Sequence, residues 1–300
     1  MQRAVADSRE EAHLPFIAVD WGTTNRRVYR IERGNVVATE RDDIGILSVP
    51  MGGFPAQIAE LRTRFGGLPI VRAGMVGSDR GWHDAGYVCR TATIESVAAA
   101  MVQPEHGVAI VPGVCVNTRG RTEVMRGEEV QLLGAVAAGL APVDALLCQP
   151  GTHSKWAVMK DGAIADFTTA MTGEMFALLK SHALIGREMY GDVEADAAFR
   201  EGVETCADTD LLSALFGVRA ASLLGKRAPG EAAAYVSGLL IGSDCRARIT
   251  RPGMTIHLLA DGLLSRLYSA AITIAGGRVV IVDSQVSFIA GIARIRNLMS

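Results

Sequence analysis

The sequence predicts an α/β protein that contains a duplicated domain, because one strand-and-turn pattern occurs twice in the chain of 300 residues. The first copy spans residues 16–40 and the second spans residues 145–167. In each copy an apolar strand ends in a polar turn with a Gly-Thr pair, and two further strands follow, separated by a tight turn. Helices are predicted elsewhere from apolar residues three and four positions apart, as in Phe54–Phe65. A chance similarity between two hairpins is the alternative.

The first turn, residues 21–25, carries groups that bind oligophosphates. The apolar run Phe16–Val19 leads into Asp20, which is typical of a buried strand whose end faces a cleft. Glycine lets the backbone approach a ligand closely, and hydroxyl, amide and backbone N–H groups donate to phosphate oxygens. The candidate phosphate ligands are Gly22, Thr23, Thr24 and Asn25, and Asp20 is the candidate ligand of a hydrated Mg²⁺. An ordinary hairpin with a polar turn is the alternative reading.

The second turn, residues 150–154, has the same position in the second copy. The apolar strand Ala145–Cys148 precedes it, a second strand follows at Trp156–Lys160, and Asp161-Gly162 is a strong hairpin signal. Two such turns facing one another can hold the phosphates of a nucleotide from both sides. The candidate nucleotide ligands are Gly151, Thr152, His153, Ser154 and Lys155. For His153 a structural role stays open, and for Lys155 so does that of a solvated strand residue.

Five motifs identify the chain with a known family: DWGTTN at 20–25, AGMVGSDRGW at 73–82, MRGEEVQLLGA at 125–135, PGTHSKW at 150–156 and MTGEMFALL at 171–179. The sequence resembles the 2-dehydro-3-deoxygalactonokinase family of the sugar kinase, actin and heat-shock chaperone superfamily. This resemblance implies an α/β fold with two ribonuclease-H-like domains, the actin-like ATPase/sugar kinase fold, and an interdomain nucleotide cleft. It implies an N-terminal domain at 1–142 with the first phosphate loop and sugar-acid pocket. The C-terminal domain at 143–300 would hold the second phosphate loop and the adenosine site.

A glycine-rich loop follows the predicted strand Pro69–Ala73. In open α/β sheets, ligands bind beyond the carboxyl ends of strands, so this loop is a candidate pocket for the sugar acid. Its candidate substrate ligands are Gly74, Met75, Ser78 and Trp82. A simple strand-to-helix connection is the alternative. Near the other end of the chain, the strand Ile256–Ala260 leads to Gly262, which by the resemblance lies on the adenine side of the nucleotide.

The segment Arg126–Glu129 opens a predicted helix and carries two successive acids. Acids in the first turn of a helix are favoured by the helix dipole, so helix-end electrostatics alone can explain them. By the resemblance, the catalytic base lies at the start of the helix before the second phosphate loop. Glu128 is therefore the expected base and Glu129 the alternative. Arg126 is the expected partner of the substrate carboxylate, because a guanidinium pairs bidentately with that group; a surface cation is the alternative.

Composition excludes other classes of protein. The net charge of −2, without a cluster of Lys or Arg, argues against nucleic acid as a partner. The longest apolar stretch, residues 132–148, is interrupted by Pro142 and Asp144 and is too short to span a membrane. The first thirteen residues lack the apolar core of a signal peptide and are expected to form a tail. Five widely spaced cysteines without a C-x-x-C pair predict reduced thiols and a cytoplasmic protein.

These features together predict a magnesium-dependent, ATP-using kinase of carbohydrate metabolism. By the resemblance, the reaction is ATP-dependent phosphorylation of 2-dehydro-3-deoxy-D-galactonate to its 6-phosphate in galactonate catabolism. A kinase for another keto-deoxy sugar acid or sugar is one alternative. A nucleotide-gated binding protein like actin or a chaperone is the other, although the chain leaves little room for an interaction domain. The expected partner is a small-molecule sugar acid, and a homodimer stays open.

Overall fold

The computed structural model describes residues 14–299. Contacts divide this chain into two compact units. Unit 1 consists of the chain up to Val143, Met159–Asp166 and the chain from Gln285 onward; unit 2 consists of Asp144–Val158 and Phe167–Ser284. The predicted tail at residues 1–13 lies outside the described part. The predicted domains, 1–142 and 143–300, stay a prediction, but the C-terminal helix and a short hairpin segment belong to unit 1.

Unit 1 is built around a six-stranded sheet with the order β3-β2-β1-β4-β7-β6. Its elements are β1 (Phe16–Trp21), β2 (Arg26–Glu32), β3 (Asn35–Asp42), α2 (Phe54–Phe65), β4 (Ile70–Gly74), β5 (Tyr87–Cys89), α3 (Ile94–Ala99), β6 (Val102–Glu105), β7 (Val108–Ile110), β8 (Gly113–Thr118), β9 (Arg121–Met125), α4 (Glu128–Ala137) and α10 (Ser284–Asn297). β1 runs antiparallel to β2 and parallel to β4, so it lies in the middle of the sheet. Helix α2 packs on this sheet, and its residues Phe54, Ile58, Leu61 and Phe65 are buried in the same hydrophobic core as residues of β1 and β4.

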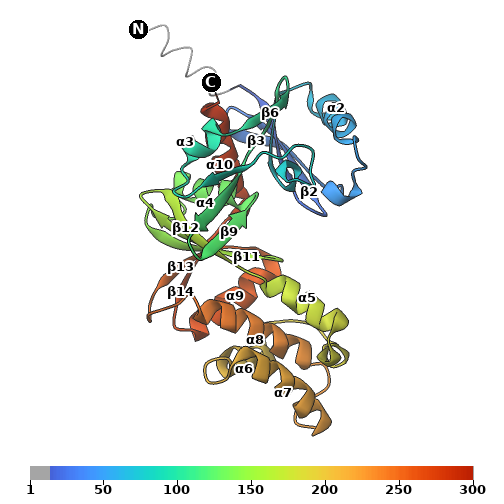
Figure 1. Ribbon diagram of the computed structural model, residues 1–300, viewed down its shortest axis with the longest axis vertical. Coiled ribbons are helices and arrows are strands. Elements are labelled where there is room, and N and C mark those ends of the chain that lie inside the picture. Colours follow the sequence, from blue (N-terminus) through green and yellow to red (C-terminus); the bar gives the residue numbers. More distant parts are fainter. Residues whose placement is uncertain (1–13, 300) are drawn as a thin grey trace. The chain divides into compact units, whose positions relative to one another are not determined.

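Helix α10 packs on unit 1 through glycine contacts with α4. A side chain on Gly134 of α4 would collide with the carbonyl oxygen of Ser287 and with the backbone of Gly291. On the same helix, Phe288 packs against Tyr29 of β2 with ring centroids 5.6 Å apart. Figure 1 shows this red helix beside α4, although the two are far apart in the sequence. The end of the chain therefore completes the unit that the beginning of the chain starts.

Unit 2 repeats the strand order of unit 1. Its five-stranded sheet has the order β12-β11-β10-β13-β14. Numbered by their order in the sequence, these are the third, second, first, fourth and fifth strands of the sheet. Its elements are β10 (Ala145–Gln149), β11 (Ser154–Lys160), β12 (Ala163–Ala170), α5 (Thr172–His182), α6 (Ala197–Thr205), α7 (Leu211–Leu223), α8 (Ala232–Arg246), β13 (Thr255–Leu259), α9 (Gly262–Ile274) and β14 (Arg278–Val282). Without its edge strand β6, the sheet of unit 1 has the order β3-β2-β1-β4-β7, which is the same arrangement. The duplication predicted from the sequence is therefore confirmed.

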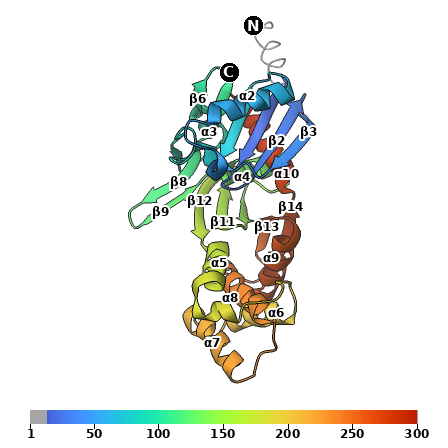
Figure 2. The same cartoon turned by 90° about the vertical axis from the view of Figure 1, so that its right-hand side faces the viewer.

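The helices of unit 2 pack closely where small residues meet. A side chain on Gly238 of α8 would collide with the carbonyl oxygen of Phe199 in α6, and one on Gly202 of α6 would collide with that of Tyr235. Figure 2 shows α6, α7 and α8 grouped together, with α9 next to β13 and β14. Gly238 of α8 and Gly202 of α6 thus allow these two helices to pack closely. The α/β class and the ribonuclease-H-like strand order are confirmed; a nucleotide site between domains stays a prediction.

Two local features of the chain depend on a glycine and a proline. Helix α7 continues through Gly217, because a single helical glycine costs only about 1 kcal/mol. Residues 108–118 form two strands, β7 and β8, which lie in different sheets on either side of Pro112. Within residues 14–299, no helix is long and apolar enough to cross a membrane.

The contact between α4 and α10 predicts opposite effects for one kind of substitution. Gly134→Ala should destabilise the protein by about 1–3 kcal/mol, because the added methyl group overlaps backbone atoms of α10. Gly217→Ala is the matched control in α7, where a side chain would meet nothing within 4 Å. It should stabilise the protein by about 0.5–1 kcal/mol through the higher helix propensity of alanine. Urea unfolding of both variants measures this, and equal effects would contradict the packing described.

Candidate active site

Asp20 lies at the carboxyl end of the central strand of unit 1. Across the sheet it pairs with Arg27 of β2 on one side and Ala73 of β4 on the other. Burial raises the pKa of Asp20 to about 6; the charge of Arg27 lowers it and that of Glu128 raises it further. The influence of Glu128 indicates that the start of α4 and the end of β1 lie close enough for their carboxylates to interact.

Two glycines bring these segments together. Gly74 ends β4 with φ +92°, and a Cβ there would lie 2.7 Å from the carbonyl oxygen of Trp21. Gly127 precedes α4 with φ +106°, and its Cβ would lie 3.0 Å from the Cα of Gly74. L-residues rarely adopt such φ values, so both positions favour glycine for conformation and for space. The predicted substrate residue Gly74 is therefore at the site in unit 1, where its role is close backbone packing.

The two acids at the start of α4 have different surroundings. Glu129 is fully buried, and its Oε2 accepts a hydrogen bond of 2.7 Å from the backbone N–H of Gly127. Burial, and then the nearby charge of Glu128, raise the pKa of Glu129 to about 8. Glu128 is partly exposed, and its Oε2 accepts a 3.0 Å hydrogen bond from the backbone N–H of Arg126. Of the two acids, Glu128 is thus the one that a ligand can reach.

The first turn forms a polar pocket of about 190 Å³ in unit 1. Its lining consists of Asp20, Gly22, Thr23, Thr24, Asn25, Arg27 and Arg41. The turn is fixed by a 2.9 Å bond from the N–H of Gly22 to the carbonyl of Asn25 and a 2.9 Å bond from Asn25 Nδ2 to Thr24 Oγ1. Within the described residues, the N–H groups of Thr23 and Thr24 have no intramolecular acceptor assigned. These exposed groups and two arginines suit an anion.

Arg27 and Arg41 were not among the residues selected from the sequence. They form a directly opposed pair on β2 and β3. Two like charges at opposed positions of an antiparallel pair repel one another unless an anion lies between them. Counting outward from the first turn would have shown that Arg27 is opposite Asp20. Arg41 is opposite Arg27 only because the register between β2 and β3 shifts between Arg30 and Ile31.

Arg126 has a buried guanidinium with incomplete hydrogen bonding. Its side chain is 4% exposed and lies over the ring of Tyr87 at 4.4 Å. Nη2 donates to the carbonyl of Gly86 at 3.1 Å and lies 3.5 Å from Asp84. Nε and Nη1 are buried without a partner among the described residues. Unpaired buried donors are costly, so this side chain suits a ligand that brings an acceptor.

The other predicted substrate residues have partners of their own in unit 1. The hydroxyl of Ser78 donates to the carbonyl of Met75 at 2.8 Å, and Met75 packs on the core. Trp82 lies under the guanidinium of Arg72 at 4.2 Å and stacks with Phe54 at 6.4 Å. These contacts shape the loop after β4.

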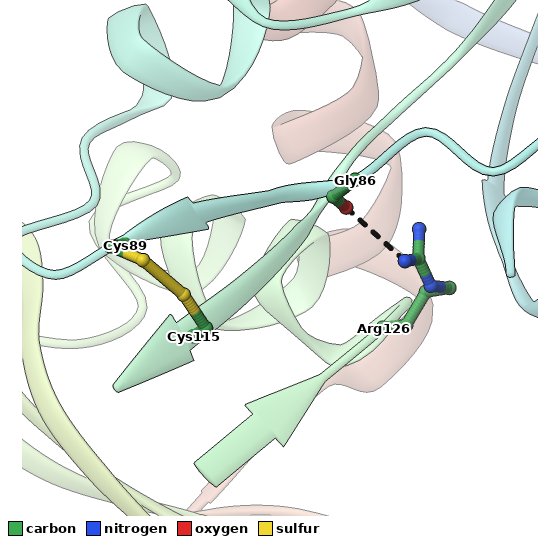
Figure 3. Close-up of a disulfide and its surroundings, with 4 residues drawn as sticks. All are labelled: Gly86, Cys89, Cys115 and Arg126. Atoms are coloured by element: carbon green, nitrogen blue, oxygen red, sulfur yellow. Dashed lines mark hydrogen bonds between the residues drawn. A yellow bond between two sulfur atoms is a disulfide. The ribbon is translucent and has the colours of Figure 1, made fainter. Parts of the chain in front are cut away.

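A disulfide joins Cys89 of β5 to Cys115 of β8, next to the strand segment that holds Arg126 (Figure 3). The prediction that the thiols are all reduced is therefore wrong for this pair. β5 pairs with β8 in a register that sets residue 89 beside residue 115, and a separation of 26 residues gives no sign of this in the sequence. Cys148, Cys206 and Cys245 are free thiols.

The second turn is held by the start of α5 within unit 2. The N–H of Glu174 donates to the carbonyl of Thr152 at 2.9 Å, and its carboxylate lies 2.5 Å from Nε2 of His153. Gly151 is partly exposed and Thr152 exposed, as expected for ligands, whereas Ser154 and Lys155 are buried. His153 is thus engaged with Glu174, which agrees with the structural alternative considered for it.

An apolar pocket of about 200 Å³ lies beside this turn in unit 2. Its walls include Gly151, Phe176, Leu240, Leu263 and Tyr268. Gly262 begins α9 with φ +57°, immediately before two of the lining residues. A flat, mostly apolar base would find van der Waals contacts here.

Two polar turns at the ends of equivalent strands, in two units with the same strand order, define an actin-like ATPase or sugar kinase class of protein. The profile of the 2-keto-3-deoxy-galactonokinase family matches residues 20–295, and the chain belongs to that family.

Relatives support this assignment over nearly the whole chain. A 2-dehydro-3-deoxygalactonokinase from Escherichia coli (strain K12) is 35% identical over 290 residues, which cover 95% of this chain and 98% of that protein. A protein of Rhizobium meliloti (strain 1021) to which the same name has been assigned is 35% identical over 296 residues, 93% of this chain and 95% of its own. A crystal structure from Sinorhizobium meliloti with the same assignment has 34% identity and a TM-score of 0.87, covering 93% of this chain and 97% of that one.

The buried acid predicts a pH effect on stability. The folded protein keeps a proton on Glu129 until its pKa of about 8, whereas the unfolded chain releases it near 4.5. Because the folded state binds more protons between these values, the free energy of unfolding falls as pH rises through them. Glu129→Gln has no proton to lose, so its melting temperature relative to the wild type should rise from about pH 5 to about pH 8. Glu60→Gln, at an exposed site on α2, is the control. A constant difference for Glu129→Gln would contradict the assignment.

Proposed function

We propose that the protein transfers the γ-phosphoryl group of ATP to 2-dehydro-3-deoxy-D-galactonate and forms the 6-phosphate. The observation that carries this proposal is the buried Arg126, whose unpartnered donors lie two residues before the partly exposed Glu128. A carboxylate-binding cation and an acid on one short segment suit a substrate that has both a carboxylate and a hydroxyl to be phosphorylated. Membership in the family and the names of its relatives support the choice of substrate.

Each residue of this segment receives a separate role. Arg126 binds the carboxylate of the acid, and Glu128 accepts the proton of the acceptor hydroxyl. Glu129 keeps a proton at neutral pH and accepts from Gly127, so it fixes the start of α4. Gly74 permits this arrangement, and the loop with Met75, Ser78 and Trp82 shapes the acid site around it.

The nucleotide roles are divided between the turns. Gly22, Thr23, Thr24 and Asn25, with Arg27 and Arg41, bind phosphate oxygens in unit 1. Gly151 and Thr152 bind them in unit 2, and the apolar pocket next to Gly262 receives the base. Phosphoryl transfer through a loose transition state depends mainly on positioning and charge stabilisation. These ligands can provide both. ATP as the donor is consistent with a cytoplasmic protein; homodimer formation stays a prediction.

The residues at the first turn fit a hydrated Mg²⁺. In the described chain, no group of three or more His, Cys, Asp or Glu could hold a metal ion on its own. Mg²⁺ usually keeps several waters and uses one or two carboxylates together with substrate phosphates, so Asp20 is an adequate protein ligand. Burial and the charge of Glu128 disfavour an ionised Asp20, and a cation would relieve both effects. When bound, Mg²⁺ neutralises phosphate charge.

The reaction is tested directly by ADP release. We expect ADP to form only when a 2-keto-3-deoxy acid is present, with the galactonate-derived acid preferred over its epimer, plain aldonic acids and neutral sugars. Omission of Mg²⁺ should abolish the rate. Equal ADP release with and without every acceptor would overturn the proposal and favour a nucleotide-gated binding protein.

The choice between the two acids is tested by amide variants. Glu128→Gln should lower kcat by about 10²–10⁴-fold while nucleotide still binds, because proton acceptance belongs to the transition state. Glu129→Gln should keep most of kcat, since this residue acts in its protonated form. The opposite result would move the base to Glu129. Full activity of both variants would remove the base from the start of α4.

The role of Arg126 is tested by acceptor specificity. Arg126→Ala should raise KM for the acid by about tenfold or more and weaken the preference for acids over neutral sugars, because an ion-paired carboxylate loses its partner. Arg121→Ala, at the start of the strand β9 that ends just before Arg126, removes a partly exposed arginine that pairs with Asp166, and should leave both quantities unchanged. Loss of kcat at unchanged KM and specificity would contradict a carboxylate site.

A further inference from the structure

The buried carboxylate of Asp244 collects hydrogen bonds from three elements of unit 2. It lies on α8 and is 7% exposed. Its Oδ1 accepts from Trp156 Nε1 at 3.0 Å. Its Oδ2 accepts from Thr172 Oγ1 at 3.0 Å and from Tyr268 OH at 3.1 Å. These donors come from β11, α5 and α9, so one side chain ties three elements to a fourth.

The ionised form of Asp244 matches this set of neighbours. Burial raises the pKa of Asp244 above its usual value, and the hydrogen bonds from Trp156, Thr172 and Tyr268 offset part of that rise. The indole N–H can only donate, and a carboxylate can only accept. With Asp244 ionised, the protons of all three bonds belong to Trp156, Thr172 and Tyr268.

Proton counting extends this order to the second turn. Tyr268 has a single hydroxyl proton, which it donates to Asp244. Its oxygen lies 2.6 Å from Ser154 Oγ, so Ser154 must be the donor of that bond. Ser154 therefore spends its only proton inside unit 2 and has none left for a phosphate oxygen. The predicted phosphate ligand Ser154 is then an anchor of the turn.

The same network reaches the other side of the turn through α5. Thr172 is the first residue of α5, and the next residue, Gly173, packs on the backbone of Gly151 and Thr152. The N–H of Glu174 holds the carbonyl of Thr152. Thr172 and Tyr268 also line the apolar pocket. Both flanks of the second turn and one wall of the pocket thus depend on the same carboxylate.

We propose that Asp244 is the positioning residue of the second turn: it orients the hydroxyl groups of Thr172, Tyr268 and Ser154 and so holds Gly151 and Thr152 in a phosphate-binding conformation. The inference rests on the proposed function, because that function assigns nucleotide to this turn. Asp244 is not among the residues that line the apolar pocket. Its removal should therefore change nucleotide affinity and leave the affinity for the acid, assigned to unit 1, nearly unchanged.

Tyr268→Phe removes only the hydroxyl that connects Asp244 to Ser154 and keeps the ring. Tyr235→Phe is the matched control: this tyrosine is also buried in unit 2, and its hydroxyl bonds Thr205 Oγ1 at 3.3 Å, away from the turn. Calorimetric titration of the full chain with ADP measures binding without turnover. Tyr268→Phe should weaken ADP binding by about tenfold, and Tyr235→Phe by less than about twofold, at similar melting temperatures.

Substitutions at Thr172 test the hydroxyl group directly. Thr172→Ser keeps the donor to Asp244 and should bind ADP within about twofold of the wild type, whereas Thr172→Val should lose about tenfold. Asp244→Asn should lose at least as much, since an amide offers one acceptor oxygen to three donors. KM for the acid should change by less than about twofold in every variant.

The outcomes separate this inference from the proposed function. If the wild-type protein binds no ADP, the proposed function fails. If it binds ADP and Tyr268→Phe or Thr172→Val binds equally well, the positioning role is overturned. Parallel loss in Tyr235→Phe, or an equal rise of KM for the acid, would assign Asp244 to general stability. If Asp244→Asn does not fold, the Tyr268 and Thr172 variants decide.

Discussion

The candidate acid site depends on one steric constraint, the close approach of backbone at Gly74 and Gly127. Because neither residue has a side chain, the start of α4 can lie on the ends of β1 and β4, where a Cβ at Gly127 would be 3.0 Å from the Cα of Gly74. That approach brings Glu128 near Asp20, and the resulting repulsion contributes to the raised pKa of Asp20. A larger residue at either position would move Glu128 away from Asp20. The chemistry that we assign to this end of the sheet would then be lost.

Much of this arrangement is readable from the sequence, because it depends on local rules. Turns, apolar strands and helix starts follow from residue type and spacing, and the strand-turn pattern revealed the duplication. Long-range register is different. The hairpin between β2 and β3, counted outward from its turn, would set Arg27 opposite Glu40; the irregularity after Arg30 shifts the partner to Arg41. This shift of one residue in the register replaces an expected ion pair with two opposed cations, and no local sequence pattern predicts the shift. The pairing of Cys89 with Cys115 and the donors around Asp244 depend equally on contacts distant in sequence.

The duplicated fold has diverged in how each turn is supported. In unit 1 the turn is exposed, and cationic side chains from neighbouring strands lie beside it. In unit 2 the turn is fixed from below by buried hydroxyl groups and from the side by α5. Backbone hydrogen bonds hold both turns, from Ile46 to Gly22 in unit 1 and from Glu174 to Thr152 in unit 2, so the turns differ in the cations beside the first and the buried hydroxyl groups behind the second. This division agrees with the general observation that chemistry resides in the site and is not dictated by the fold.

The return of α10 to unit 1 has a consequence for biosynthesis. A ribosome makes β1 before every element of unit 2 and α10 after them, yet α10 covers α4 and the face of β2 that carries Tyr29. Until the residues of α10 have emerged from the ribosome, this apolar surface of the nascent chain lacks its native cover. Domains usually fold in the order of synthesis, with the N-terminal one first. Unit 1 departs from that order, because its native packing requires a helix that follows every strand of unit 2 in the sequence.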